Sequence, residues 1–231
     1  MAFEIGSQAH IAALVATGVV CSAIILFRER LRRPRIHVLF RYVMAGLLVC
    51  CELSLQIWYV VSDNWGLHSF PFQLCSLMVL LSAALLLTRN RKLNDIVFFL
   101  GILGALQALL TPNLDVSFPH FRYFNFFIAH LGIIAACVYT AAVESYRPNI
   151  RSLLRAFLWL HVLAVPAAIT NYWADTNFMF LARKPSTASL LDMLAPWPWY
   201  LLQLELVVLL LCLLLLGLMQ WFRKLELSQG N

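Results

Sequence analysis

Charged residues are scarce in this 231-residue chain, where Asp, Glu, Lys and Arg together make up 12% of the sequence. Soluble domains of this length carry roughly a quarter charged residues. The shortage excludes a water-soluble globular enzyme, and the apolar excess equally excludes a disordered or fibrous chain. Hydrophobic residues make up 62% of the chain, and the mean hydropathy is +0.80. This composition predicts an all-α, polytopic membrane protein.

Sequence signatures of several common functions are missing. The net charge is +6, but no basic patch is interleaved with aromatic residues, so we expect no nucleic acid partner. The six cysteines all lie in apolar stretches without CxxC spacing, which argues against a disulfide framework and a structural zinc site. No apolar span carries an interior lysine for a retinal Schiff base, and no internal repeat indicates an inverted-repeat transporter.

Seven apolar runs are long enough to cross the roughly 30 Å hydrocarbon layer as helices. They lie near residues 11–27, 38–61, 71–88, 95–111, 123–143, 153–173 and 199–222. The sequence therefore predicts a single domain, 1–231, with seven transmembrane helices. Its longest connection, 174–198, joins the sixth and seventh helices, and connections of this length often form lids or binding segments.

The distribution of basic residues predicts the orientation. Of the 17 Lys and Arg residues, 14 lie in the loops that follow the first, third, fifth and seventh runs or in the first few residues after these loops. Cytoplasmic loops of membrane proteins carry such an excess of Lys and Arg. We therefore expect the N-terminus outside, the C-terminus in the cytoplasm and the 174–198 connection on the outer side.

Ionisable side chains are rare inside the expected spans, and such residues by default face a bundle interior or a cavity. Glu52 and Glu205 are the carboxylates well inside a span, and His130 and His161 are the embedded histidines. At about 1.5 Å per helical residue, Cys75, His130, Glu205 and Glu52 all fall in the outer half of the bilayer. His161 falls nearer the middle, and we interpret it as structural.

Helical spacing groups further polar residues onto shared faces. These groups are Glu52, Gln56 and Tyr59 on the second span, Gln107 and Thr111 on the fourth, and Tyr123, Phe126 and His130 on the fifth. A polar cavity that opens toward the outer leaflet is the simplest arrangement that keeps these groups out of lipid.

Cys75 differs from the other cysteines because Pro71 and Gln73 place it near the start of a helix, where the dipole favours a thiolate. A thiol and an imidazole on different helices suffice for acyl transfer through a thioester. His130 would act as general base and acid, with Glu52 or Glu205 orienting its ring. The alternative is that all four groups are structural, as core thiol or hydrogen-bonding partners.

Four segments together resemble a known family: PFQLC (71–75), FNFFIAH (124–130), NYWADTNFMFLARKP (171–185) and SLLDMLAPWPWY (189–200). Their order and topological sides are similar to those of the YwaF-type bacterial integral membrane proteins. That family is related to the eukaryotic transmembrane protein 164. The resemblance extends from about residue 40 to residue 205, and it implies a location in the bacterial cytoplasmic (inner) membrane.

The resemblance also implies an activity, since the eukaryotic relative moves a fatty acyl chain onto lyso ether phospholipids with a cysteine and a histidine in its membrane core. The matching positions in this chain are Cys75 and His130. The resemblance does not extend to the eukaryotic lipid substrate. Substrate-binding residues around the mouth of the cavity would be Tyr123, Asn171, Tyr172, Asn177, Arg183 and Lys184.

Three functional hypotheses follow. The first is a lipid acyltransferase or transacylase that acts on membrane phospholipids without a cofactor, using Cys75 and His130. Its supporting polar residues would be Glu52, Gln56, Gln107 and Glu205. The second is a non-enzymatic protein that binds, transports or senses a lipid or small solute in the same cavity. The third is a zinc-dependent lipid hydrolase, which would need three or more ligands meeting at one depth.

Overall fold

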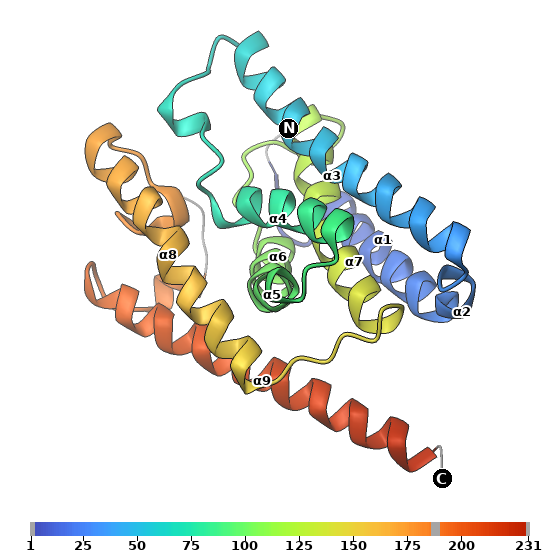
Figure 1. The fold of residues 1–231 in the computed structure, drawn as a ribbon. Helices are drawn as coiled ribbons and strands as arrows, with labels where there is room; N and C mark the ends of the chain where they lie inside the picture. Colours follow the sequence, from blue (N-terminus) through green and yellow to red (C-terminus); the bar gives the residue numbers. More distant parts are fainter. Residues whose placement is uncertain (1–2, 186–189, 230–231) are drawn as a thin grey trace.

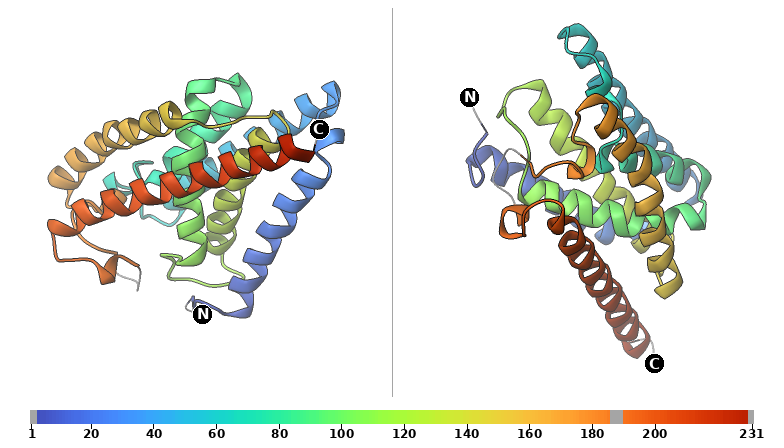
Figure 2. Two further views of the ribbon diagram at one scale, coloured as in Figure 1. Left: turned by 90° about the horizontal axis from the view of Figure 1, so that it is seen from below. Right: turned by 90° about the vertical axis from the view of Figure 1, so that its left-hand side faces the viewer.

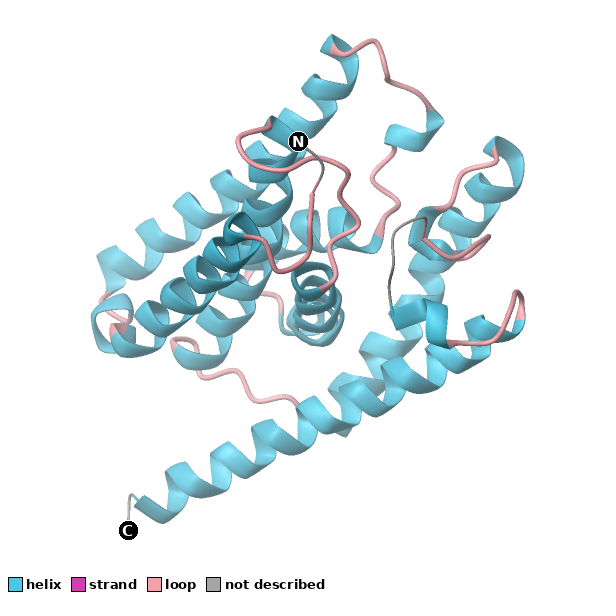
Figure 3. Ribbon diagram, turned by 180° about the vertical axis from the view of Figure 1, so that it is seen from behind, coloured by secondary structure: helices cyan, strands magenta, loops and turns pink. Residues whose placement is uncertain are grey.

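The computed structural model describes residues 3–185 and 190–229, and these form helices and connecting loops without a strand (Figure 3). The nine α-helices of this described part are α1 (Gln8–Leu26), α2 (Arg28–Leu31), α3 (Pro34–Val61), α4 (Leu74–Thr88), α5 (Arg91–Ile96), α6 (Ile102–Leu110), α7 (Phe121–Ala142), α8 (Ile150–Ala174) and α9 (Trp199–Gln229). The all-α prediction is confirmed. Residues 186–189 of the expected long connection lie outside the described residues.

Six helical segments in the described chain are long and apolar enough to cross a membrane, with Arg91–Leu110 counted as one. The protein is therefore an integral membrane protein with several spans. The expected span at 71–88 begins only at Leu74, and its 15 residues extend about 22 Å, short of the hydrocarbon layer. Gln73 is the N-cap and has extended backbone (φ −65°, ψ 140°), so residues 71–73 belong to the preceding loop and not to the helix. The predicted count of seven spans is not confirmed.

Helices α3, α4 and α7 and the Arg91–Leu110 segment pack together as the core of the bundle, and α1 packs against α7 (Figure 1). The contact between α3 and α7 is close because Gly132 has no side chain. A Cβ atom at Gly132 would lie 2.8 Å from Cδ2 of Leu48, and Leu48 is fully buried. Small residues permit such close approach of membrane helices.

The segment Arg91–Leu110 is interrupted by a π-helical turn, Val97–Gly101, that the sequence did not predict. All five residues of the turn are buried, and the chain continues as a helix on both sides. Turns of this kind are frequent at functional sites. Leu100 of this turn contributes to the wall of the cavity described below.

Helices α8 and α9 lie along one side of the core, and the C-terminal end of α9 extends beyond it (Figure 2). They contact each other, and α8 also packs against α5. Only 17% of the apolar stretch of α8 and 11% of that of α9 are buried. Their outer faces carry exposed aliphatic side chains such as Leu158 and Leu206, as expected of helices in contact with lipid.

Candidate functional site

A cavity of about 680 Å³ lies between the core helices and the α8–α9 pair. Its volume falls within the roughly 300–1,000 Å³ of ligand sites in proteins. Most of the polar residues that the sequence singled out line it, on six different helices. They are Glu52, Gln56 and Tyr59 of α3, Cys75 of α4, Gln107 of α6, His130 of α7, His161 of α8 and Glu205 of α9, with Thr111 just after α6.

Cys75 is the second residue of α4, and Gln73 is the N-cap. Cys75 therefore lies in the first turn of the helix, where the backbone N–H groups have no partner within the helix. Gln73 also contacts the segment that follows α8, because its Oε1 accepts a hydrogen bond from the Met179 N–H at 3.0 Å. The sequence placed Cys75 near the start of this helix, although it set that start at residue 71 and not at Leu74.

His130 is 5% exposed, and its ring packs on that of Phe126 with 4.2 Å between centroids. Its Nδ1 lies 2.6 Å from the Phe126 carbonyl oxygen. A carbonyl can only accept, so Nδ1 carries the proton and Nε2 presents a lone pair. Among the described residues, Nε2 has no hydrogen-bond partner, and His130 and Cys75 line the same cavity without a hydrogen bond between them.

The carboxylates expected to orient His130 have other partners. Glu52 accepts a hydrogen bond from Gln56 Nε2 at 3.1 Å, and Glu205 pairs with Nε2 of His161. The His130 ring is held by a main-chain carbonyl one turn earlier on its own helix instead. The interpretation of His161 as structural omitted its position on the cavity wall, where it links α8 to α9.

The polar residues expected at the cavity mouth instead organise the turn after α8. Asn171 donates to the Phe178 carbonyl at 3.0 Å, and its Oδ1 accepts from the Phe178 N–H at 2.7 Å. Asn177 similarly donates to the Arg183 carbonyl at 2.8 Å and accepts from the Arg183 N–H at 3.0 Å. Asparagine amides commonly bond nearby backbone in turns, so these side chains are used within the segment itself.

The other residues predicted around the mouth also lie off the cavity wall. Arg183 pairs with Asp175, and Lys184 donates to the Leu194 carbonyl at 2.7 Å. Tyr172 is 83% exposed, outside the cavity. Tyr123 donates to the Ala9 carbonyl at 2.7 Å and belongs to a separate apolar cluster with Leu109, Leu114 and Phe127. The 171–185 segment contributes apolar residues to the cavity wall, namely Met179, Phe180, Leu181 and Pro185.

The family comparison agrees with this architecture. The model of the TMEM164 family matches residues 5–216, which is most of the chain. The chain belongs to the TMEM164 family. The matched region includes every element that lines the cavity, so the resemblance seen in the sequence motifs is confirmed at the level of the family. Neither the curated proteins nor the solved structures gave a match.

The sequence interpretation of this TMEM164-family protein did not assign several polar lining residues to the cavity, among them Arg122 and Asn125. Arg122 lines the cavity, and its guanidinium donates a hydrogen bond to Tyr59 Oη at 3.1 Å and lies over the Trp58 ring. Asn125 donates to the Cys51 carbonyl at 2.7 Å and joins α7 to α3. Asn125 lies in the FNFFIAH segment (124–130), but the sequence interpretation gave neither Asn125 nor Arg122 a place in the cavity.

A metal-ligand set is missing from the described part of this TMEM164-family protein. Within residues 3–185 and 190–229, no three His, Cys, Asp or Glu side chains gather closely enough to hold a metal ion. A catalytic zinc site takes three protein ligands and an open position. The zinc hydrolase hypothesis therefore finds no ligand set among these residues.

Proposed function

We propose that the protein is a membrane-embedded acyltransferase that moves a fatty acyl chain between phospholipids and lysophospholipids through a thioester on Cys75. One observation carries the proposal: a thiol in the first turn of a helix and an imidazole with an available Nε2 line a single cavity beside lipid-facing helices. Membership of the TMEM164 family supports the proposal.

In the first half-reaction, the Cys75 sulfur attacks the ester carbonyl carbon of the donor phospholipid while Nε2 of His130 takes the thiol proton. The carbon–oxygen bond of the ester then breaks, and the leaving glycerol oxygen receives that proton from His130. The products are a lysophospholipid and an acyl thioester on Cys75. The Phe126 carbonyl keeps its bond to Nδ1–H throughout and so stabilises the transient imidazolium.

The second half-reaction reverses the roles. The hydroxyl of an acceptor lysophospholipid gives its proton to His130 Nε2 and attacks the thioester carbonyl. The carbon–sulfur bond breaks, the thiolate takes the proton from His130, and a new ester is formed. The thiol and imidazole are not hydrogen-bonded in this structure, and in this proposal the bound substrate brings them together, because catalytic hydrogen bonds often tighten only in the substrate complex.

Substrate orientation in this proposal depends on Arg122 in place of Arg183 and Lys184. The Arg122 guanidinium lines the cavity, and a guanidinium matches the geometry of phosphate oxygens. The apolar residues Leu103, Leu160 and Val208 of the wall would hold the acyl chain. Headgroup phosphate and reacting ester would then occupy opposite parts of one site.

The test is intact mass spectrometry of the purified protein after incubation with native membrane phospholipids. The wild type should gain an acyl adduct that hydroxylamine removes, and Cys75→Ala should gain none. Cys50→Ala is the matched control, since Cys50 is exposed on α3 and does not line the cavity. An adduct that persists in Cys75→Ala would refute the nucleophile assignment.

The missing hydrogen bond between Cys75 and His130 favours a second candidate, in which the cavity binds a lipid without chemistry. The same experiment separates the two. Lipid that copurifies equally with the wild type and Cys75→Ala, with no covalent adduct in either, would support a binding or transport role.

A further inference from the structure

A second cavity, of about 830 Å³, lies at the opposite end of α4 from Cys75. It is formed by the end of α4, the start of α5, the loop between α7 and α8, and the start of α8. Among the described residues, none lines both cavities. Cys75 in the first cavity and Thr88 in the second are about 20 Å apart along the axis of α4.

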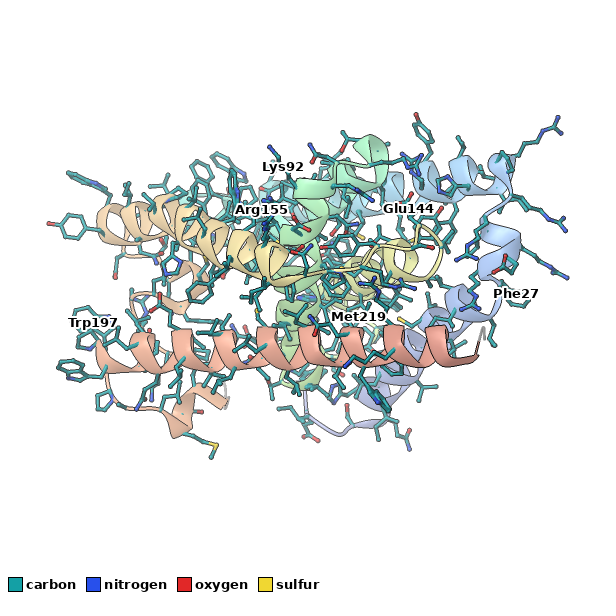
Figure 4. The ribbon with its side chains drawn as sticks, turned by 60° about the horizontal axis from the view of Figure 1, so that its bottom comes forward. Phe27, Lys92, Glu144, Arg155, Trp197 and Met219 are labelled. Carbon is teal, nitrogen blue, oxygen red and sulfur yellow. The ribbon has the colours of Figure 1, made fainter. Side chains whose placement is uncertain are left out.

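The wall of this second cavity is strongly basic. Five arginines line it, against the two carboxylates Asp95 and Glu144, which leaves a formal charge of +3. The arginines are Arg89, Arg91, Arg147, Arg151 and Arg155. Figure 4 labels Arg155 on α8 and Glu144 in the segment that joins α7 to α8, on the same side of the ribbon.

The two carboxylates are already engaged by the protein. Asp95 is buried, pairs with Arg155 and accepts a hydrogen bond from Tyr146 Oη at 2.6 Å. Burial and this hydrogen bond raise the pKa of Tyr146 well above its ordinary value, so its hydroxyl remains a donor. Glu144 lies 3.3 Å from Arg89 Nε. Both carboxylates of the wall are thus paired with arginines of the chain.

Two guanidinium groups remain available at the rim. Arg91 and Arg151 are exposed, and neither side chain forms a hydrogen bond or ion pair with the part of the chain that the structure describes. The 25-residue helix α8 also begins here, with its N-cap Asn149 on the wall. The positive end of its dipole adds to the potential of the arginines.

We propose that this second cavity binds a phosphate-bearing anion, held directly by Arg91 and Arg151. Guanidinium forks match phosphate oxygens and form the stronger, charge-assisted class of hydrogen bond. Arginines that only orient a loop need neither a cavity nor buried carboxylates to position them. The phosphate belongs either to the headgroup of an anionic phospholipid or to a soluble molecule, and both present the same chemistry to the site.

The experiment compares three forms of the full chain in detergent: wild type, Arg91→Gln/Arg151→Gln, and the control Arg33→Gln/Arg35→Gln. The control removes equal charge from exposed arginines that do not line the cavity. One arm counts phosphatidic acid molecules retained in native mass spectrometry. The other titrates inorganic pyrophosphate and follows the thermal unfolding midpoint. We expect about a tenfold or greater loss of affinity in the cavity variant alone.

The two arms distinguish a lipid headgroup from a soluble phosphate ligand. A loss confined to phosphatidic acid identifies a lipid headgroup, and a loss confined to pyrophosphate identifies a soluble phosphate ligand. Equal binding by all three proteins, or an equal loss in the control, overturns the proposal. If the double variant does not fold, the single variant Arg91→Gln must still weaken binding at least threefold, and unchanged binding there would also overturn it.

Discussion

The contact between Gly132 of α7 and Leu48 of α3 gives a prediction with a defined magnitude. A Cβ at position 132 would lie 2.8 Å from Leu48 Cδ2, whereas carbon atoms pack best about 3.5–4.0 Å apart. Leu48 is fully buried and cannot move aside freely. Gly132→Ala should therefore introduce an overpacking penalty of about 1–3 kcal/mol, offset by roughly 1 kcal/mol of improved helix propensity.

The matched control is Gly46→Ala on α3, where an added Cβ meets nothing within 4 Å. That variant should gain the roughly 1 kcal/mol of helix propensity without a penalty. The thermal unfolding midpoint of the purified protein is the assay, and about 2–4 °C per kcal/mol is expected for a chain of this size. Gly46→Ala should unfold at a higher temperature than the wild type and Gly132→Ala at the same or a lower one.

A double variant identifies the clash itself. Gly132→Ala combined with Leu48→Ala should be more stable than the two single effects added together, by at least about 0.5 kcal/mol. Because His130 lies two residues from Gly132, thioester formation should also fall in Gly132→Ala and not in Gly46→Ala. Equal shifts of the midpoint in the two alanine variants would refute the close α3–α7 contact.

Three further predictions concern single side chains. His130→Ala should reduce thioester formation on Cys75 at least about 100-fold, and Glu205→Gln should reduce it less than tenfold, because the Phe126 carbonyl and not Glu205 holds the imidazole. Rapid-quench mass spectrometry measures both rates, and equal losses would show that Glu205 orients the imidazole. Asn171→Ala should lower the free energy of unfolding by about 1–3 kcal/mol, because the backbone of Phe178 loses two buried hydrogen bonds. Proteolysis of the turn after α8 should also be faster in this variant, and an unchanged cleavage rate would contradict the prediction. Tyr123→Phe should lower the free energy of unfolding by about 0.5–1.5 kcal/mol but leave acyl transfer unchanged, since the Tyr123 hydroxyl donates to a main-chain carbonyl outside the cavity. A loss of acyl transfer in this variant would indicate that Tyr123 contacts the substrate.

The cavity-lining residues were predictable because lipid tolerates few ionisable groups. Glu52, His130 and Glu205 are conspicuous in apolar helices, and expelling them from lipid requires a shared interior space. Helical periodicity then assigned Gln56 and Gln107 to the same space, where the structure places them.

What the sequence could not predict depends on backbone geometry in loops and irregular helices. Asn171 and Asn177 have the composition of ligand-binding residues, but their amides bond neighbouring backbone, a choice that only the turn conformation determines. The start of α4 was placed three residues early because its apolar run extends back past Pro71. The partner of His130 is a carbonyl, which has no signature in the sequence at all.

The π-helical turn Val97–Gly101 has a consequence for how this protein tolerates change. A π turn accommodates one residue more than an α turn, and each residue of an α-helix advances the direction of its side chains by about 100°. The turn therefore sets the angular offset between Asp95, which lines the arginine-rich cavity, and Gln107, which lines the cavity that contains Cys75. Deleting a single residue there would restore regular α-helix and rotate one half against the other by roughly that angle. At least one of the two cavities would then lose the residue that this segment contributes to its wall. The buried π-helical turn therefore fixes the rotational alignment of the two ends of the molecule.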